Sequence, residues 1–177
     1  MSLEAALQRL WYGPRWMSLP LWPLAWLFRA VVGLRSALYR AGALRMHRVS
    51  VPVVVVGNIT VGGTGKTPVA AWLAAQLTLR GHRVGGVLRG YGGRAQRTPQ
   101  VVTPASDAAE VGDEALLHAL RRPHVVAVGA DRVAAARLAA EQGAEVVVCD
   151  DGLQHLRLVR DCGIVVVDAA RGLGNRR

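Results

Sequence analysis

One segment of this chain joins an apolar strand to a helix through a glycine-rich loop. Val51 to Val56 has the continuous apolar character of a strand covered on both faces, and residues 68–80 have the length and composition of a helix. Between them lies the run Gly57-Asn58-Ile59-Thr60-Val61-Gly62-Gly63-Thr64-Gly65-Lys66-Thr67. A strand, a glycine loop and a Lys-Thr pair at the start of a helix are typical of loops that bind nucleotide phosphates. The segment therefore predicts an α/β fold with a nucleotide site.

Lys66 is the only lysine of the chain, against twenty-one arginines. A compact ammonium fits a tight phosphate-binding loop better than the broad fork of arginine does. Thr60 departs from the general loop pattern, which has glycine there, and Pro68 excludes the dinucleotide fingerprint, which needs glycine or alanine. Thr67 would offer its hydroxyl to Mg²⁺. We expect the ATP phosphates to be bound by Thr60, Val61, Gly62, Gly63, Thr64, Gly65, Lys66 and Thr67.

The rest of the chain alternates between apolar strands and helices. Strands are predicted at 51–56, 83–88, 124–128, 145–149 and 163–167, and helices at 68–80, 112–121 and 131–142. This alternation predicts a nucleotide-triphosphatase-like parallel sheet flanked by helices. Residues 89–109 form the longest stretch without a pattern, and a long loop at the end of a strand is more often functional than idle.

The N-terminal quarter carries an unusual charge. The net charge of +10 suits nucleic acid, an anionic membrane or a phosphorylated substrate. Residues 1–48 contain seven arginines, one acidic residue and four of the five tryptophans, a mixture typical of membrane interfaces, whereas no nucleic-acid motif is present. The longest uncharged stretch of this N-terminal part, 16–28, contains two prolines and is shorter than the roughly 20 residues that span a bilayer.

We therefore expect two parts. Residues 1–48 would form a helical segment lying in or dipping into the cytoplasmic leaflet, and residues 49–177 a core lobe. A secretory signal and a partly buried core helix are the alternatives for the first part. Cys149 and Cys162 both flank valine-rich strands, which predicts buried thiols in a reducing compartment, and the five histidines show no metal-ligand spacing.

Two groups of carboxylates could take part in chemistry. Gly112-Asp113-Glu114 opens a predicted helix, where the helix dipole alone favours acidic residues. Asp150-Asp151-Gly152-Leu153-Gln154-His155 follows a buried strand, at the place where such folds hold the acid that supports Mg²⁺. An Asp-Gly turn is the alternative explanation for the second group. Asp168, after the last strand, is a weaker candidate.

The order and spacing of five motifs resemble those of the tetraacyldisaccharide 4′-kinase family, from near Trp11 to Asn175. The motifs are Gly57 to Pro68, Arg89-Gly90-Tyr91-Gly92, Gly112-Asp113-Glu114, Asp131-Arg132 and Asp150 to His155. The resemblance implies an enzyme of lipid A biosynthesis. It would use ATP and Mg²⁺ to phosphorylate the 4′-hydroxyl of a tetraacylated glucosamine disaccharide 1-phosphate at the cytoplasmic face of the bacterial inner membrane.

The resemblance also implies roles for single residues. Asp113 would accept the proton of the sugar hydroxyl, and Lys66 would stabilise the β- and γ-phosphates. Thr67, Glu114, Asp150 and Asp151 would organise the metal and its waters. The remaining wall of the site would come from Arg89, Tyr91, Arg132, Gln154 and His155.

Members of that family are roughly twice as long, and their second α/β lobe supplies further substrate contacts and a histidine paired with the base. We expect this chain, lacking that lobe, to bind ATP weakly and to turn over little or not at all. Two other functions remain open. One is a membrane-associated ATPase or GTPase switch, which would leave the two carboxylate groups without a role. The other is a non-catalytic remnant of the kinase.

Overall fold

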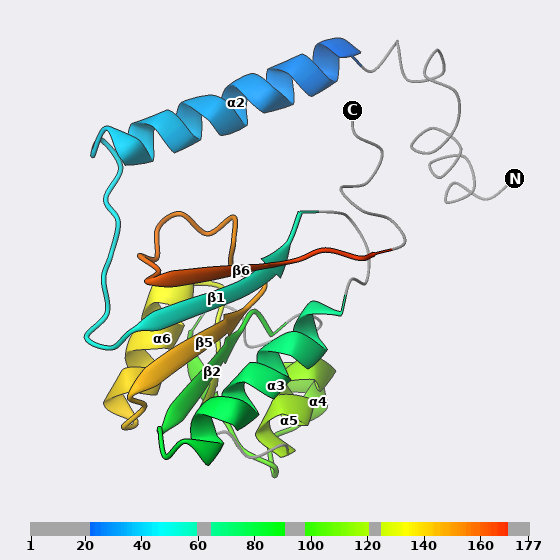
Figure 1. The fold of residues 1–177 in the computed structure, drawn as a ribbon, viewed down its shortest axis with the longest axis vertical. Coiled ribbons are helices and arrows are strands. Elements are labelled where there is room, and N and C mark those ends of the chain that lie inside the picture. Colours follow the sequence, from blue (N-terminus) through cyan, green and yellow to red (C-terminus); the bar gives the residue numbers. More distant parts are fainter. Residues whose placement is uncertain (1–21, 60–64, 91–97, 121–124, 170–177) are drawn as a thin grey trace, which may run out of the picture.

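A six-stranded sheet with helices on both faces forms the centre of the fold (Figure 1). The structure is a computed structural model that describes residues 22–59, 65–90, 98–120 and 125–169. The strands are β1 Val53–Asn58, β2 Val84–Leu88, β3 Gln100–Val102, β4 Val125–Val128, β5 Val146–Asp150 and β6 Cys162–Val166. The helices are α2 Trp22–Arg40, α3 Lys66–Leu79, α4 Ala108–Val111, α5 Asp113–Leu120 and α6 Arg132–Glu141.

The strand order is β3-β4-β2-β5-β1-β6, and every pairing in it is parallel except that of β3 with β4. The predicted α/β fold with a parallel sheet flanked by helices is therefore confirmed, with one antiparallel edge strand added. That strand lies within 89–109, which the sequence indicated to be irregular, and α4 begins at the end of the same stretch. The prediction missed them because each is only three or four residues long.

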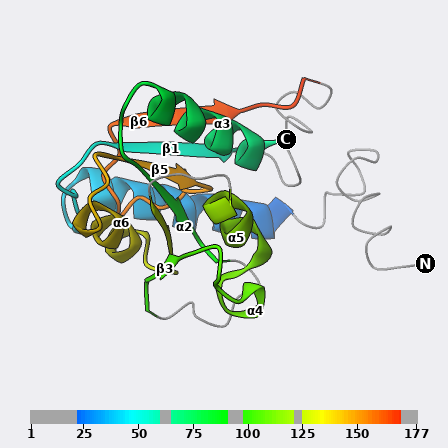
Figure 2. The same ribbon diagram turned by 90° about the horizontal axis from the view of Figure 1, so that it is seen from below.

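Alternate residues of the strands supply the cores of the two helical layers. In β1, Val53 and Val55 pack with the alanine-rich face of α6, whereas Val56 packs with Ala70 and Ala74 of α3. Figure 2 shows α3 and α6 on opposite faces of the sheet. Gly85 permits the close approach of α6, because a Cβ there would lie 3.0 Å from the Cβ of Ala139 in that helix. Both faces of the sheet are thus covered, as the continuous valine runs predict.

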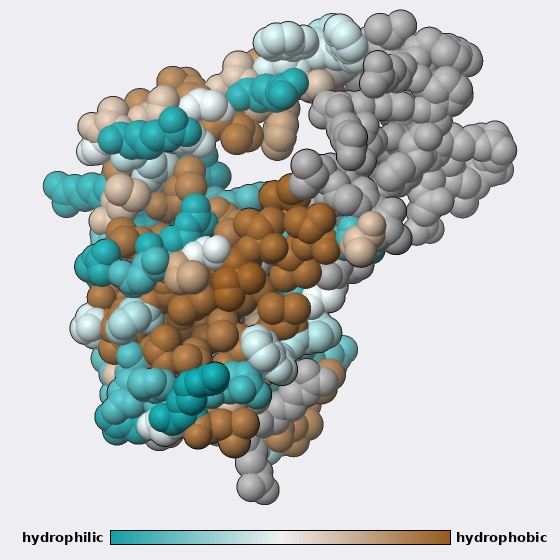
Figure 3. All heavy atoms as spheres, in the orientation of Figure 1, coloured by the Kyte–Doolittle hydropathy of each residue, from teal (hydrophilic) through white to brown (hydrophobic). Residues whose placement is uncertain are grey.

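Helix α2 lies beyond the β6 edge of the sheet and buries none of its residues (Figure 1). Its large apolar side chains, among them Trp22, Trp26 and Phe28, are exposed, and its surface mixes hydrophobic with hydrophilic groups in Figure 3. A partly buried core helix is therefore the wrong interpretation for residues 22–40. Within the described ranges, none of the helices has both the length and the apolar character needed to cross a membrane.

The two cysteines are free and lie in different surroundings. Cys149 is fully buried in β5, and this burial raises the pKa of its thiol to about 12, which keeps the group neutral. The prediction of a buried thiol is confirmed there. It is wrong for Cys162, which is exposed because it begins the edge strand β6.

Candidate functional site

A cavity of about 450 Å³ opens where the carboxyl ends of β1, β2 and β5 meet, a volume that suits a small ligand. Six residues singled out from the sequence line it: Lys66, Arg89, Arg132, Asp151, Gln154 and His155. The sequence did not indicate its other lining residues, which are Arg35, Asn58, Ile59, Ala130 and Leu153. Of these, Asn58 and Ile59 belong to the loop run, where only the residues from Thr60 onward were expected to bind.

The loop run leads from β1 into the first turn of α3. Gly65 begins this helix in the left-handed region, with φ 76°, and no side chain caps the helix. Among the described residues, the first N–H groups of α3 therefore have no side-chain partner, an arrangement that favours an anion. Thr67 lies half-buried in this first turn. The predicted phosphate contacts of Thr60, Val61, Gly62, Gly63 and Thr64 lie outside the described residues, as does Tyr91.

Lys66 forms an ion pair across the mouth of the cavity. Its Nζ lies 2.9 Å from Oδ1 of Asp151, and the exposed fractions of the two side chains are 23% and 63%. Asp151 adopts a positive φ of 61°, and its N–H donates to the carbonyl oxygen of Val56. The end of β1 thus fixes the turn that presents the carboxylate. A phosphate that binds Lys66 competes with this carboxylate for the ammonium.

The turn after β5 packs closely on the end of β1. A Cβ at Gly57 would lie 2.7 Å from Cγ of Leu153, so only glycine admits this contact. Leu153 precedes Gln154 and His155, and all three line the cavity. Gly57, which looks in the sequence like a flexible part of the loop, is therefore a residue of β1 that positions the turn after β5.

Asp150 and His118 form a buried polar pair behind the cavity. Each is 5% exposed, and Nε2 of His118 lies 3.7 Å from Oδ2 of Asp150. Among the described residues, neither carboxylate oxygen of Asp150 has a hydrogen-bond partner. Nε2 of His118 has none there either. An ionised carboxylate buried without donors is costly, which is characteristic of a group kept for a ligand. No local pattern in the sequence marked His118, because its partner Asp150 lies more than thirty residues further along the chain.

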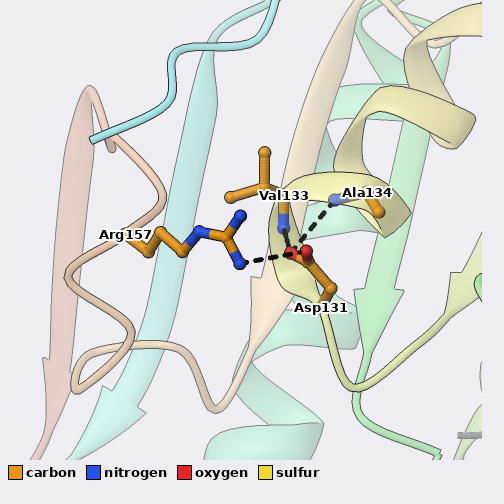
Figure 4. Close-up of polar contacts among 4 residues, drawn as sticks. All are labelled: Asp131, Val133, Ala134 and Arg157. Atoms are coloured by element: carbon orange, nitrogen blue, oxygen red, sulfur yellow. Dashed lines mark hydrogen bonds and ion pairs between the residues drawn. The ribbon is translucent and has the colours of Figure 1, made fainter. Parts of the chain in front are cut away.

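Asp131 caps α6 next to the cavity (Figure 4). Its carboxylate accepts from the N–H groups of Val133 and Ala134 at 2.9 and 3.3 Å and pairs with Arg157 at 3.2 Å. Burial alone would raise the pKa of Asp131, but these hydrogen bonds and the Arg157 cation outweigh it and hold the pKa below its ordinary value. Asp131 therefore has a structural role at the start of α6.

Arg132 and His155 form the wall nearest α6. Arg132 is buried, its Nη1 donates to the carbonyl oxygen of Gly129 at 2.7 Å, and burial lowers the pKa of its guanidinium. Burial is also the main cause that lowers the pKa of His155, and the cations of Arg132, Arg35 and Arg157 lower it further. This wall is therefore positively charged, with a histidine that favours its neutral form.

Asp113 and Glu114 are exposed in the first turn of α5, and the described lining of the cavity includes neither. Asp150 is likewise absent from that lining, because its side chain points to the α5 face, where His118 is. Helix α5 runs back to the start of β4, so its first turn lies at the same edge of the sheet as the cavity. The structure thus places Asp113, Glu114 and Asp150 at one edge of the sheet, but it does not bring their carboxylates together in one cluster.

Comparisons with known proteins agree on one family. The family described as tetraacyldisaccharide-1-P 4′-kinase matches residues 17–177. The tetraacyldisaccharide 4′-kinase of Alkalilimnicola ehrlichii is 56% identical over 162 residues, which are 92% of this chain and 49% of that protein. That of Pseudomonas paraeruginosa is 48% identical over 178 residues, covering 100% of this chain and 54% of that protein.

A solved structure is also similar. It is the "apo" form of LpxK from Aquifex aeolicus in complex with ATP, with a TM-score of 0.74 and 36% identity. The similarity covers 82% of this chain and 47% of that one. The chain therefore spans about half the length of the relatives it matches.

Proposed function

Because this chain belongs to the tetraacyldisaccharide-1-P 4′-kinase family, we propose that it forms the ATP-binding half of a lipid kinase of lipid A biosynthesis. The reaction transfers the γ-phosphoryl group of ATP to the 4′-hydroxyl of a tetraacylated glucosamine disaccharide 1-phosphate. The observation that carries this proposal is the position of Lys66, at the uncapped start of α3 and in the wall of a cavity at the carboxyl edge of the sheet. The ATP-bound Aquifex aeolicus relative supports the choice of nucleotide.

The nucleotide is bound through its phosphates. Thr60 to Gly65 supply backbone N–H groups, the first turn of α3 supplies more, and the ammonium of Lys66 neutralises the β- and γ-oxygens. To bind these oxygens, Lys66 gives up its ion pair with Asp151. Because phosphoryl transfer needs mainly positioning and charge neutralisation, these groups supply the larger part of what the donor side requires.

Mg²⁺ suits the chemistry of the carboxylates around the end of β5, although among the described residues no three possible ligands lie together as a preformed metal site. The ion prefers oxygen ligands and uses one or two carboxylates together with phosphate oxygens and water. Asp150 has two buried carboxylate oxygens without hydrogen-bond partners among the described residues, and Asp151 follows it directly. With the hydroxyl of Thr67 and the carboxylate of Glu114, they would hold the ion, which when bound neutralises charge on the transferred phosphate.

The acceptor enters at the carboxyl edge of the sheet, where α5 and α6 both begin. Asp113, in the first turn of α5, takes the proton from the sugar hydroxyl as the bond to phosphorus forms. Arg89, Tyr91, Arg132, Gln154 and His155 position the sugar and the transferred phosphate. The positive wall beside α6 supports this assignment, because phosphate carries negative charge throughout the reaction.

The N-terminal part brings the site to its lipid. The exposed tryptophans and phenylalanine of α2, together with the arginines that follow them, suit a helix that lies at the surface of the inner membrane on its cytoplasmic face. Residues 1–48 then act as the membrane-associating segment and residues 49–177 as the catalytic lobe. An acceptor with four acyl chains stays in the bilayer, so the enzyme must come to it.

A chimera tests the proposal. Residues 1–177 are joined to the C-terminal half of the Alkalilimnicola ehrlichii kinase and supplied with Mg²⁺, γ-labelled ATP and the disaccharide lipid. We expect label on the lipid from the chimera, and little or none from residues 1–177 alone. Asp113→Ala should abolish transfer and spare ATP binding, whereas Lys66→Ala should weaken ATP binding.

Other outcomes would contradict the proposal. Free phosphate released independently of the lipid would indicate a switch ATPase or GTPase. A folded chimera that transfers nothing, next to the active Alkalilimnicola ehrlichii parent enzyme, would indicate a non-catalytic remnant.

A further inference from the structure

One cation of the cavity wall comes from the membrane-associating helix. Arg35 belongs to α2, whereas Lys66, Arg89 and Arg132 belong to the core lobe. Of the three arginines of α2, namely Arg29, Arg35 and Arg40, only Arg35 is part of the described lining. The helix thus contributes to the site as well as to the apolar surface.

Backbone hydrogen bonds fix the segment that follows α2 beside the loop between β5 and β6. The segment after the helix pairs with the loop between β5 and β6, since the N–H of His47 donates to Arg157 at 2.7 Å and the N–H of Val159 donates to His47 at 3.0 Å. In Figure 1 this loop rises from the sheet toward α2. The same loop carries His155, and the charge of Arg35 is one of the causes that lower the pKa of its imidazole, after burial and Arg132. Arg35 therefore lies opposite the turn that forms the floor of the cavity.

The charges of the cavity do not balance. Four cationic side chains line its described part, Arg35, Lys66, Arg89 and Arg132, against the single carboxylate of Asp151. That carboxylate pairs with Lys66. Of the ion pairs within the described ranges, none includes Arg35, whose guanidinium lies 5.9 Å from the ring centroid of Tyr39. A cation held over a ring and left without a carboxylate is suited to bind an anion.

We propose that Arg35 binds the phosphate group of the acceptor lipid. The inference rests on the proposed function and adds the residue that recognises the 1-phosphate after which the family is described. The phosphates of ATP belong at the other side of the cavity, where Lys66 and the first turn of α3 lie. An arginine on a helix at the membrane surface stays at the depth of lipid phosphates, and its planar fork can donate two hydrogen bonds to one phosphate. The helix that meets the membrane thereby also selects the headgroup.

Vesicle flotation with the 177-residue chain tests the proposal. Three phosphatidylcholine vesicles are compared: one with the tetraacyldisaccharide 1-phosphate, one with the same lipid lacking the phosphate, and one with phosphatidylglycerol at equal charge. We expect the wild-type chain to prefer the phosphorylated disaccharide over both others. Arg35→Ala should lose about tenfold of this preference, which corresponds to the loss of one charge-assisted contact, and Arg35→Lys should keep part of it.

Arg29→Ala is the matched control, because it removes the same charge from the same helix at a position outside the described lining. It should weaken binding to all anionic vesicles equally and leave the preference unchanged. Circular dichroism confirms that each variant is folded, and ATP affinity, measured by calorimetry, should be the same for Arg35→Ala as for the wild type.

Three results would overturn the inference. Arg35→Ala could keep the preference, it could lower it no more than Arg29→Ala does, or it could weaken ATP binding instead. Failure of the proposed function looks different, since the chimera would then transfer no phosphate whatever the vesicles show. A wild-type chain without any preference for the phosphorylated disaccharide, beside an active chimera, would overturn the role of Arg35 alone.

Discussion

Asp150 is the residue at which folding and function conflict most clearly. Its carboxylate ends the buried strand β5, and within the described part of the chain it pairs with His118 at 3.7 Å, too far for a good hydrogen bond. Burying an ionised group without donors costs free energy of folding. A position that keeps such a group is expected to serve a ligand, and Mg²⁺ is the ligand that we propose.

Asp150→Asn should therefore stabilise the fold and impair the site. The amide carries no charge to desolvate, so we expect a gain of about 1 kcal/mol and a rise in Tm of about 2–4 °C, together with weaker Mg²⁺-dependent ATP binding. Thermal melts and calorimetry measure the two effects. Asp161→Asn is the control, because the carboxylate of Asp161 is partly exposed and bonded to the N–H of Val53 and to Arg48, and it should give no gain. A lower Tm for Asp150→Asn would show that the carboxylate has a stabilising partner.

The residues that the sequence could predict are those that local patterns mark. Lys66, with its glycines, and Asp151, at the end of a strand, are recognisable within a dozen residues of chain. Arg35 and His118 are not, because their importance depends on contacts with residues more than thirty positions away. The three arginines of α2 look alike in the sequence, and only the tertiary fold distinguishes Arg35 from its neighbours.

At the scale of elements, long-range pairing decides where strands begin and end. The sequence indicated that β1 ends at Val56, before the first glycine of the loop run. In the structure it continues through Gly57 and Asn58, because β6 pairs with both residues, opposite Val165 and Val166. Likewise β3 exists through its pairing with β4. The type and order of the long elements could be predicted from local periodicity, whereas these boundaries could not.

Helix α6 depends on its N-cap. Asp131→Ala removes two hydrogen bonds to the first turn and should cost about 1 kcal/mol at neutral pH, whereas Asp131→Asn keeps an acceptor oxygen and should cost little. The native pKa of Asp131 is lowered, so its ionised form contributes stability that is complete above the ordinary value of 3.8 and is lost as pH falls through the lower native value. Asp131→Asn should remove this part of the acid sensitivity. Melts at neutral and acidic pH provide the measurement, and equal losses for both variants at neutral pH would contradict the capping role.

At the scale of the whole molecule, membrane contact and fold are separable. Helix α2 buries no residue, so its apolar side chains contribute little to the stability of the sheet and its helices. Their exposure supports the proposed contact with a bilayer surface, to which apolar area and positive charge would both contribute binding free energy. The sequence indicated this segment through its tryptophans and arginines, but not that it also forms part of the cavity wall.

Trp26→Ser combined with Phe28→Ser should therefore weaken binding to anionic vesicles by at least tenfold without changing Tm by more than about 1 °C. Trp72→Ser is the matched control, because Trp72 on α3 is 62% exposed, close to the 66% of Trp26, yet lies on the core lobe. Its vesicle binding should equal that of the wild type. Equal weakening by both changes would mean that the molecule meets the membrane through a different surface.

The ion pair between Lys66 and Asp151 also limits which anions the cavity can admit. A carboxylate fixed to the same chain competes for the ammonium at a high effective concentration. A small anion with one charge, free in solution, offers no more charge than Asp151 and lacks that advantage. A triphosphate carries several charges and also reaches the N–H groups at the start of α3. We therefore expect only anions with several charges to displace Asp151 from Lys66. Common cellular anions such as chloride or acetate would leave Lys66 available to the nucleotide.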